Sequence, residues 1–273
     1  MKAKTISANA SKLLEQLHKD NLTFFTLSDA SSLLPALKPV ALRAQLRQMV
    51  NKGLLLRIEG GLYTIIPFEQ NSANYFPNWH QAAAALANPN EYYIGFYSAL
   101  DIHGLITQPS LLEQIVTKKR ILPKKRQIKK IRFEFITLNE KHFFGYKKHW
   151  IDDFNQVYCS DLEKTFVDSL YKPDYAGGIT EIVKALYKSK NQINTKKLEE
   201  YTELFDAQVV LKRLGFIAEK LEIFEDLRSS LLKKITDAYA PLDPLLPKKG
   251  ITDSRWKIID NLDIDTVITS IHT

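Results

Sequence analysis

The sequence predicts an α+β protein: a small N-terminal winged helix-turn-helix followed by a mixed α/β, helix-rich C-terminal domain. Three observations support this fold class. The chain has 273 residues, a length that suits about two domains. Between residues 38 and 66 a helical apolar pattern gives way to two short β-prone runs around a pair of glycines. From residue 79 strand-like and helix-like segments alternate to about residue 175, and the pattern is mainly helical after that.

A helix is predicted to begin at Pro39, because proline suits a first helical position, where its missing N–H would lack a partner. Gly53 stands where a helix end favours a residue that adopts positive φ. Between them one apolar stripe recurs at helical spacing. Its members are Leu42, Leu46, Met49 and Val50.

The rest of the N-terminal module follows from similar signals. A first helix is predicted from Ser7 to Lys19, then a short strand around Phe24, and a second helix capped by Thr26 or Ser28. Two β-prone runs, 54–58 and 62–66, are joined through Gly60 and Gly61, which indicates a tight hairpin. The order of helix, strand, helix, helix and hairpin is typical of a winged helix-turn-helix over residues 1–66.

The predicted third helix also carries a polar face. A helix in the DNA major groove needs small residues for close approach and long donors, with Arg favouring guanine and Gln favouring adenine. Lysine or arginine at the helix end and on the hairpin would contact the phosphate backbone. The expected N-cap is a lysine, although Ser, Thr, Asp or Asn is favoured there. The candidate DNA-binding residues are Lys38, Arg43, Ala44, Arg47, Gln48, Lys52 and Arg57. The alternative interpretation is a solvated helix face beside a structural hairpin.

Composition restricts the function classes. The chain holds 38 Lys and Arg against 31 Asp and Glu, a formal charge of +7 with pI near 9.2, which is compatible with a polyanionic partner. Cys159 is the only cysteine, so an intrachain disulfide and cysteine-rich zinc motifs are excluded. We find no signal-peptide pattern, no apolar run long enough to cross a bilayer and no HExxH motif. We therefore expect a cytoplasmic protein without membrane association, catalytic residues, metal or cofactor.

The remaining chain divides by composition. Residues 67–78 hold two prolines and lack periodicity, so we predict a linker there. Residues 79–273 are predicted to form the C-terminal domain. Apolar stripes in two later segments predict helices; these stripes are Ile179, Ile182, Val183, Leu186 and Tyr187, and Val210, Leu214, Ile217, Ala218 and Leu221.

A basic segment between two predicted strands contains no acidic residue. Its cations are Lys118, Lys119, Arg120, Lys124, Lys125, Arg126, Lys129 and Lys130. One interpretation is a second surface for nucleic acid. The other is a solvated loop whose like charges repel one another, and Pro123 favours a loop over a helix.

The acidic residues around position 163 invite a catalytic interpretation, because carboxylates with a lysine can hold a metal ion. Asp161 and Glu163 are two residues apart, however, so on a helix they point to different sides. Ser160 with Glu163 matches a capping box, and Asp161 suits the first-turn dipole. We therefore expect Asp161, Glu163, Lys164 and Asp168 to be structural.

Several short stretches, in this order, resemble the AbiEi antitoxin family of bacterial type IV toxin–antitoxin systems. They are Gly60-Gly61-Leu62-Tyr63, Tyr93-Ile94-Gly95 through Ser98-Ala99-Leu100 to His103-Gly104-Leu105, Phe143-Phe144-Gly145, Ser160-Asp161-Leu162-Glu163-Lys164-Thr165 with Asp168, Gly177-Gly178, and Lys212-Arg213-Leu214-Gly215-Phe216. They span residues from about 60 to 220.

The resemblance implies a function in abortive infection. The winged helix of such a protein represses its own operon by binding inverted repeats in double-stranded DNA. Its C-terminal domain is an antitoxin that counters a cognate nucleotidyltransferase-like toxin, typically without a stable complex. The alternative is a nucleic-acid-processing enzyme that a winged helix targets to its substrate; acidic residues converging at strand ends in the C-terminal domain would favour that alternative.

Overall fold

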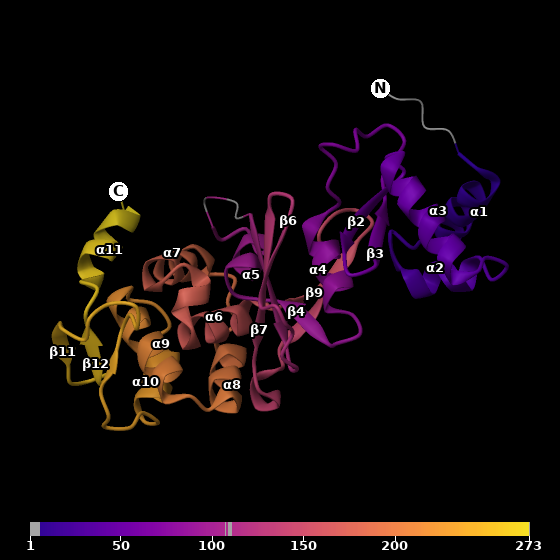
Figure 1. Ribbon diagram of the computed structural model, residues 1–273. Coiled ribbons are helices and arrows are strands. Elements are labelled where there is room, and N and C mark those ends of the chain that lie inside the picture. The colour runs from indigo at the N-terminus through magenta and orange to yellow at the C-terminus, as the bar shows by residue number, and fades with distance from the viewer. Residues whose placement is uncertain (1–5, 107, 109–110, 273) are drawn as a thin grey trace. The chain divides into compact units, whose positions relative to one another are not determined.

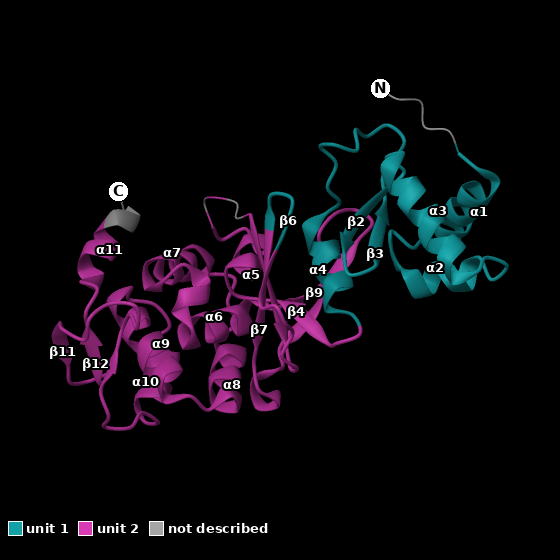
Figure 2. Cartoon of the chain, in the orientation of Figure 1, with its two compact units in different colours: residues 1–88, 127–131 teal, residues 89–126, 132–273 magenta. Residues whose placement is uncertain are grey.

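The computed structural model describes residues 6–106, 108 and 111–272 (Figure 1). These residues form eleven α-helices and three sheets, which confirms the predicted α+β class. The chain divides into two compact units (Figure 2). The N-terminal unit comprises residues 1–88 and 127–131, and the C-terminal unit comprises residues 89–126 and 132–273. Within the described ranges, no helix is long and apolar enough to span a membrane.

The N-terminal unit has the element order predicted for residues 1–66. Its elements are α1 (Ala8–Lys19), β1 (Phe24–Thr26), α2 (Leu27–Leu33), α3 (Pro39–Asn51), β2 (Leu55–Glu59), β3 (Leu62–Ile65) and α4 (Trp79–Ala87). The strands form an antiparallel sheet in the order β1-β3-β2. Thr26 caps α2 in a capping box, in which its hydroxyl accepts from the Asp29 N–H and the Asp29 carboxylate accepts from the Thr26 N–H.

One apolar cluster holds this unit together. The predicted stripe of α3 is buried, with Leu42, Leu46 and Met49 at most 1% exposed, and it packs in the same cluster as Leu13 and Leu17 of α1. The turn after α3 needs glycine: Gly53 has φ +69°, and a Cβ there would lie 2.9 Å from the Ser72 Oγ. The packing of α3 therefore leaves only its opposite face available to solvent.

Residues 67–78 contain no helix or strand. The division into two units falls between Asn88 and Pro89, after α4. The helix α4 buries Ala82, Ala83 and Leu86, but an apolar sequence pattern alone does not say which core a helix joins.

The C-terminal unit is built on a six-stranded mixed sheet in the order β6-β7-β5-β4-β9-β8. The strands and the helix between them are β4 (Tyr92–Ile94), α5 (Phe96–Ile102), β5 (Leu112–Thr117), β6 (Lys125–Ile128), β7 (Ile131–Thr137), β8 (Tyr146–Trp150) and β9 (Gln156–Ser160). The strand β4 pairs antiparallel with β5 and parallel with β9, so Ile94 lies beside both Ile115 and Cys159. The side chain of Cys159 is buried among apolar residues, and this burial raises the pKa of its thiol.

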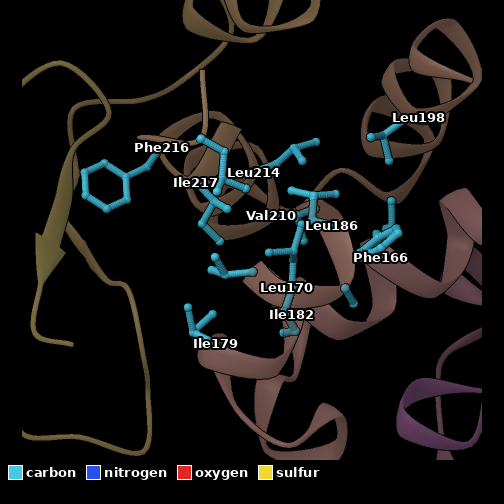
Figure 3. Close-up of a cluster of buried hydrophobic side chains, with 14 of the residues drawn as sticks. Phe166, Leu170, Ile179, Ile182, Leu186, Leu198, Val210, Leu214, Phe216 and Ile217 are labelled. Atoms are coloured by element: carbon cyan, nitrogen blue, oxygen red, sulfur yellow. The ribbon is translucent and has the colours of Figure 1, made fainter. Parts of the chain in front are cut away.

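Helices follow the sheet, as predicted. They are α6 (Leu162–Tyr171), α7 (Ile179–Ser189), α8 (Thr195–Phe205), α9 (Gln208–Lys220) and α10 (Glu225–Leu232). Figure 3 shows side chains of both predicted stripes, among them Ile182, Leu186, Leu214 and Ile217, meeting in one cluster with Phe166 and Leu170 of α6. Both segments form the predicted helices, and the two stripes are buried except for the half-buried Tyr187.

The capping box predicted at residue 160 is wrong. Asp161 is the N-cap of α6, and its side chain accepts a hydrogen bond from the Lys164 N–H. The Ser160 hydroxyl instead shares a 2.7 Å hydrogen bond with the Thr165 hydroxyl. Asp161 has the extended backbone of a cap, so its carboxylate takes the position that the prediction gave to Ser160.

The stretch from residue 240 contains short strands. It forms a small sheet of β10 (Ala240–Pro241), β12 (Ile258–Asp260) and β11 (Ile251–Asp253), followed by α11 (Ile264–His272). The short strands place Trp256 under α9, where its side chain is fully buried. Gly215 makes room for this ring, because a Cβ at residue 215 would lie 1.9 Å from the Trp256 Cζ3.

Gly215→Ala should therefore destabilise the protein. Alanine usually favours a helix over glycine by about 1 kcal/mol, but here the steric clash dominates, and overpacking costs about 1–3 kcal/mol or more. Urea unfolding at pH 7 measures the loss. In a Trp256→Leu background the clash disappears, so the same substitution should become neutral or stabilising; an equal loss in both backgrounds would contradict the packing described here.

Candidate nucleic-acid interface

The solvent-facing side of α3 carries the predicted polar residues. Arg43, Ala44, Arg47 and Gln48 are all exposed. The half-buried Gln45 borders this face and donates a 3.0 Å hydrogen bond to the Ser7 hydroxyl at the start of α1. We find no acidic partner for Arg43 or Arg47 in the part of the chain that the structure describes. The face therefore presents two uncompensated guanidinium groups beside a small side chain.

The other predicted DNA-binding residues flank this face. Lys38 is the N-cap of α3, as predicted. It is exposed, and its side chain makes no capping hydrogen bond. Lys52 is the half-buried C-cap. Arg57 is exposed on β2, next to the hairpin turn at Gly60 and Gly61, whose φ values are +51° and +95°.

The charge of residues 1–66 is strongly asymmetric. This stretch holds nine Lys and Arg against four Asp and Glu. Two of the acids are engaged away from α3: Glu15 pairs with Lys19 at 2.8 Å on α1, and Asp29 is held by the capping box of α2. The positive charge of the α3 face is therefore not neutralised by these two carboxylates.

A hollow of about 310 Å³ lies where α2 and α3 begin, lined by Leu27, Ser28, Ser31, Pro39 and Leu42. The exposed hydroxyls of Ser28 and Ser31 border it, and hydroxyls are common donors to phosphate oxygens. The sequence alone does not distinguish these serines as phosphate donors, because serine is common at helix ends for capping alone. Their spacing of three residues is the one feature of the sequence that places both hydroxyls on the same side of a helix.

The basic segment is only partly a loop. Four of its residues form β6 (Lys125–Ile128), the edge strand beside β7, so the prediction of a continuous loop between two strands is wrong. Several of its cations have partners from distant parts of the chain. Lys118 lies 2.7 Å from Glu91, and Lys124 and Lys125 lie 3.4 and 3.6 Å from Glu134.

The remaining cations of this segment differ in their surroundings. The guanidinium of Arg126 lies over the Phe135 ring, 4.6 Å from its centroid. Lys129 donates to the main-chain carbonyls of Ser72, Ala73 and Tyr75, within the N-terminal unit. Lys119, Arg120 and Lys130 are exposed, and among the described residues none of the three has an acidic partner. The whole segment therefore does not present one continuous cationic surface to a polyanion.

The acidic residues near the end of β9 come together, contrary to the prediction that they point apart. Asp161 and Glu163 both pair with Lys197 of α8, at 3.0 and 3.1 Å. Asp161 also accepts from the Tyr201 hydroxyl at 3.0 Å, and Glu163 accepts from the Asn194 N–H at 2.9 Å. With the Lys164 N–H on Asp161, every oxygen of the two carboxylates has a partner within the chain.

The pKa values agree with this pairing. Burial favours the neutral form of Glu163, but the hydrogen bonds from Asn194 and Lys197 outweigh it and lower the pKa of Glu163. Burial acts against the charge of Lys197, yet its two carboxylate partners raise its pKa. Burial and the nearby Asp161 raise the pKa of Tyr201 to about 12. These groups form a charged clamp between α6 and α8. Within the described ranges no three His, Cys, Asp or Glu side chains lie together as a metal site.

A second ion pair on α6 is fully buried. Lys164 and Asp168, one turn apart, form a salt bridge with both side chains 0% exposed. The Tyr93 hydroxyl of β4 donates to Asp168 at 2.8 Å. The rings of Phe144 and Phe205 lie 5.0 and 5.1 Å from the Lys164 ammonium. Burial lowers the pKa of Lys164 and raises that of Asp168, because the low dielectric disfavours either charge.

The fold and these sites define a mixed α+β protein of two units, with one exposed cationic helix face and two internal charge networks. The chain is similar to the Rv2827c protein from Mycobacterium tuberculosis, whose crystal structure matches 99% of this chain and 97% of that chain with a TM-score of 0.73 at 14% sequence identity. That likeness shows the fold. No family model and no curated protein matches the sequence, so the AbiEi resemblance stays a prediction.

Asp168→Asn should destabilise the protein by about 3–5 kcal/mol, because it leaves the Lys164 ammonium buried without a carboxylate. Replacing both partners, as Lys164→Met with Asp168→Leu, should cost less than either single substitution, since no charge is then buried. Urea unfolding at pH 7 compares the stability of the double variant with that of Asp168→Asn, Lys164→Met and Asp168→Leu. Glu15→Ala, which breaks an exposed pair, is the control that should leave stability unchanged. A double variant less stable than both singles would contradict this account.

Proposed function

We propose that residues 1–66 form a winged helix-turn-helix that binds double-stranded DNA, with α3 in the major groove and the β2–β3 hairpin as the wing. The observation that carries this proposal is the exposed face of α3, where Arg43, Ala44, Arg47 and Gln48 lie opposite the buried apolar stripe. Guanidinium groups without acidic partners favour a polyanion, and counterion release from DNA makes such binding stronger at low salt. We assign Arg57 and the hydroxyls of Ser28 and Ser31 to phosphate contacts.

The resemblance to AbiEi extends the proposal from a binding module to a regulator. The protein represses its own operon through inverted repeats, and its C-terminal unit counteracts a nucleotidyltransferase-like toxin without a stable complex. In this proposal it is not an enzyme. Asp161 and Glu163 do converge at a strand end, as the enzyme alternative requires, but their oxygens are hydrogen-bonded to Lys197, Tyr201 and main-chain N–H groups. This saturation favours the regulator over the nucleic-acid-processing enzyme.

The DNA-binding part is tested by mobility shift of the full chain on the region upstream of its operon. Arg47→Ala should cost about 1–3 kcal/mol on the specific sequence if Arg47 contacts a base edge. Arg57→Ala should weaken specific and unrelated sequences alike and reduce the salt dependence, because phosphate contacts carry no sequence information.

Lys19→Ala is a matched control, since Lys19 is an exposed cation paired with Glu15 on α1. It should leave DNA binding unchanged. Equal, sequence-independent losses for Arg47→Ala and Arg57→Ala would place base recognition elsewhere. Failure of the unmodified chain to shift the upstream DNA would defeat the repressor proposal.

The antitoxin part is tested in cells that express the nucleotidyltransferase-like gene next to this one. The full chain should restore growth, and a variant with Arg43→Ala and Arg47→Ala should still protect while a reporter under the operon promoter is derepressed. The physical reason is that protection resides in the C-terminal unit, which this variant leaves intact. Absence of protection by the unmodified chain, with folded protein present, would refute the antitoxin assignment.

A further inference from the structure

Val40 is an unusually exposed apolar side chain. It occupies the second position of α3, directly after Pro39, and 78% of it is accessible. Single exposed apolar residues are common on protein surfaces and need no explanation by themselves. The position of Val40 is informative because of its neighbours on the same helix.

Val40 lies on the face that carries the cations. Residues 40, 43, 44 and 47 follow the i, i+3, i+4, i+7 spacing of one helix face. All four are exposed, whereas the stripe of Leu42, Leu46 and Met49 is buried in the core of the N-terminal unit. The outer face of α3 therefore combines two short apolar side chains, Val40 and Ala44, with two guanidinium groups.

This combination matches the chemistry of a major groove containing A·T pairs. The C5 methyl of thymine is the one apolar group that base pairs present there, and apolar side chains contact it. The N-terminal residues of a recognition helix are the ones that reach base edges. Valine suits such a contact because its χ1 is restricted, so little side-chain freedom is lost on binding.

We propose that Val40, with Ala44 beside it, contacts thymine methyl groups of the operator and makes the protein prefer thymine at those positions. Arg43 and Arg47 on either side of Ala44 supply the hydrogen bonds that hold α3 in the groove. The inference rests on the proposed DNA binding and adds to it the class of base that the helix start selects.

The test compares two probes of identical sequence, the upstream region of the operon copied with either thymidine or deoxyuridine nucleotides. Uracil lacks only the C5 methyl, so the full chain should bind the uracil probe more weakly, by about fourfold for each methyl group buried by the contact. Val40→Ala should weaken binding to the thymine probe and bring the ratio of the two affinities closer to one.

Ile251→Ala is the matched control, because Ile251 is also a β-branched side chain, is 82% exposed and lies in the C-terminal unit. It should keep the ratio of the unmodified chain. Equal affinity of the unmodified chain for both probes would overturn the inference, as would an unchanged ratio in Val40→Ala. A change of oligomeric state in Val40→Ala without a change in the ratio would assign Val40 to a contact between copies instead. Absence of binding to either probe defeats the proposed function itself.

Discussion

The buried ion pair between Lys164 and Asp168 is the interaction on which the C-terminal unit depends. It lies on α6, the helix that follows β9, and the Tyr93 hydroxyl extends it to β4 in the middle of the sheet. Aromatic rings surround the Lys164 ammonium, and the Tyr93 hydroxyl hydrogen-bonds both members of the pair. A buried pair of this kind adds little net stability over apolar residues, but a structure that misplaces either partner is strongly disfavoured. The hydrogen bonds of Tyr93 to both members of the pair therefore connect α6 to the sheet.

The position of α6 in turn places the second charged group. Asp161 and Glu163 at its start hold Lys197 and Asn194 of α8, so one short helix connects the sheet with the helices that follow. The two units differ in whether their charged side chains are paired within the chain. The C-terminal unit pairs several of its charges internally, among them Lys118, Lys124 and Lys125 of the basic segment with Glu91 and Glu134. The N-terminal unit leaves the arginines of α3 in water, where a polyanion can reach them.

Periodicity and turn residues predict the first 66 residues well, because each element there is specified by its own local pattern. The helix after Pro39 and the hairpin at Gly60 and Gly61 both lie where the sequence places them. The error at Asp161 has a local cause too: helix spacing separates it from Glu163, but a cap residue has extended backbone, and its side chain swings over the first turn.

Other features required partners that are far away in the chain. The pairing of Glu163 with Lys197, for example, joins α6 to α8, and α7 separates these two helices in the chain. Charge runs and single helices carry no information on such partners. The residues assigned to DNA follow from helix geometry and the hairpin pattern, and all of them are exposed in the structure except the half-buried Lys52. Their contacts with DNA stay a prediction.

The buried thiol of Cys159 has a practical consequence for this chain. Its raised pKa and its apolar surroundings keep the thiolate, the reactive form, scarce at neutral pH. A cysteine introduced at an exposed position would then be the single site that takes a maleimide label. Pairs of such cysteines, one in each unit, would let fluorescence or spin-label distances measure how the two units are arranged in solution without first removing the native residue.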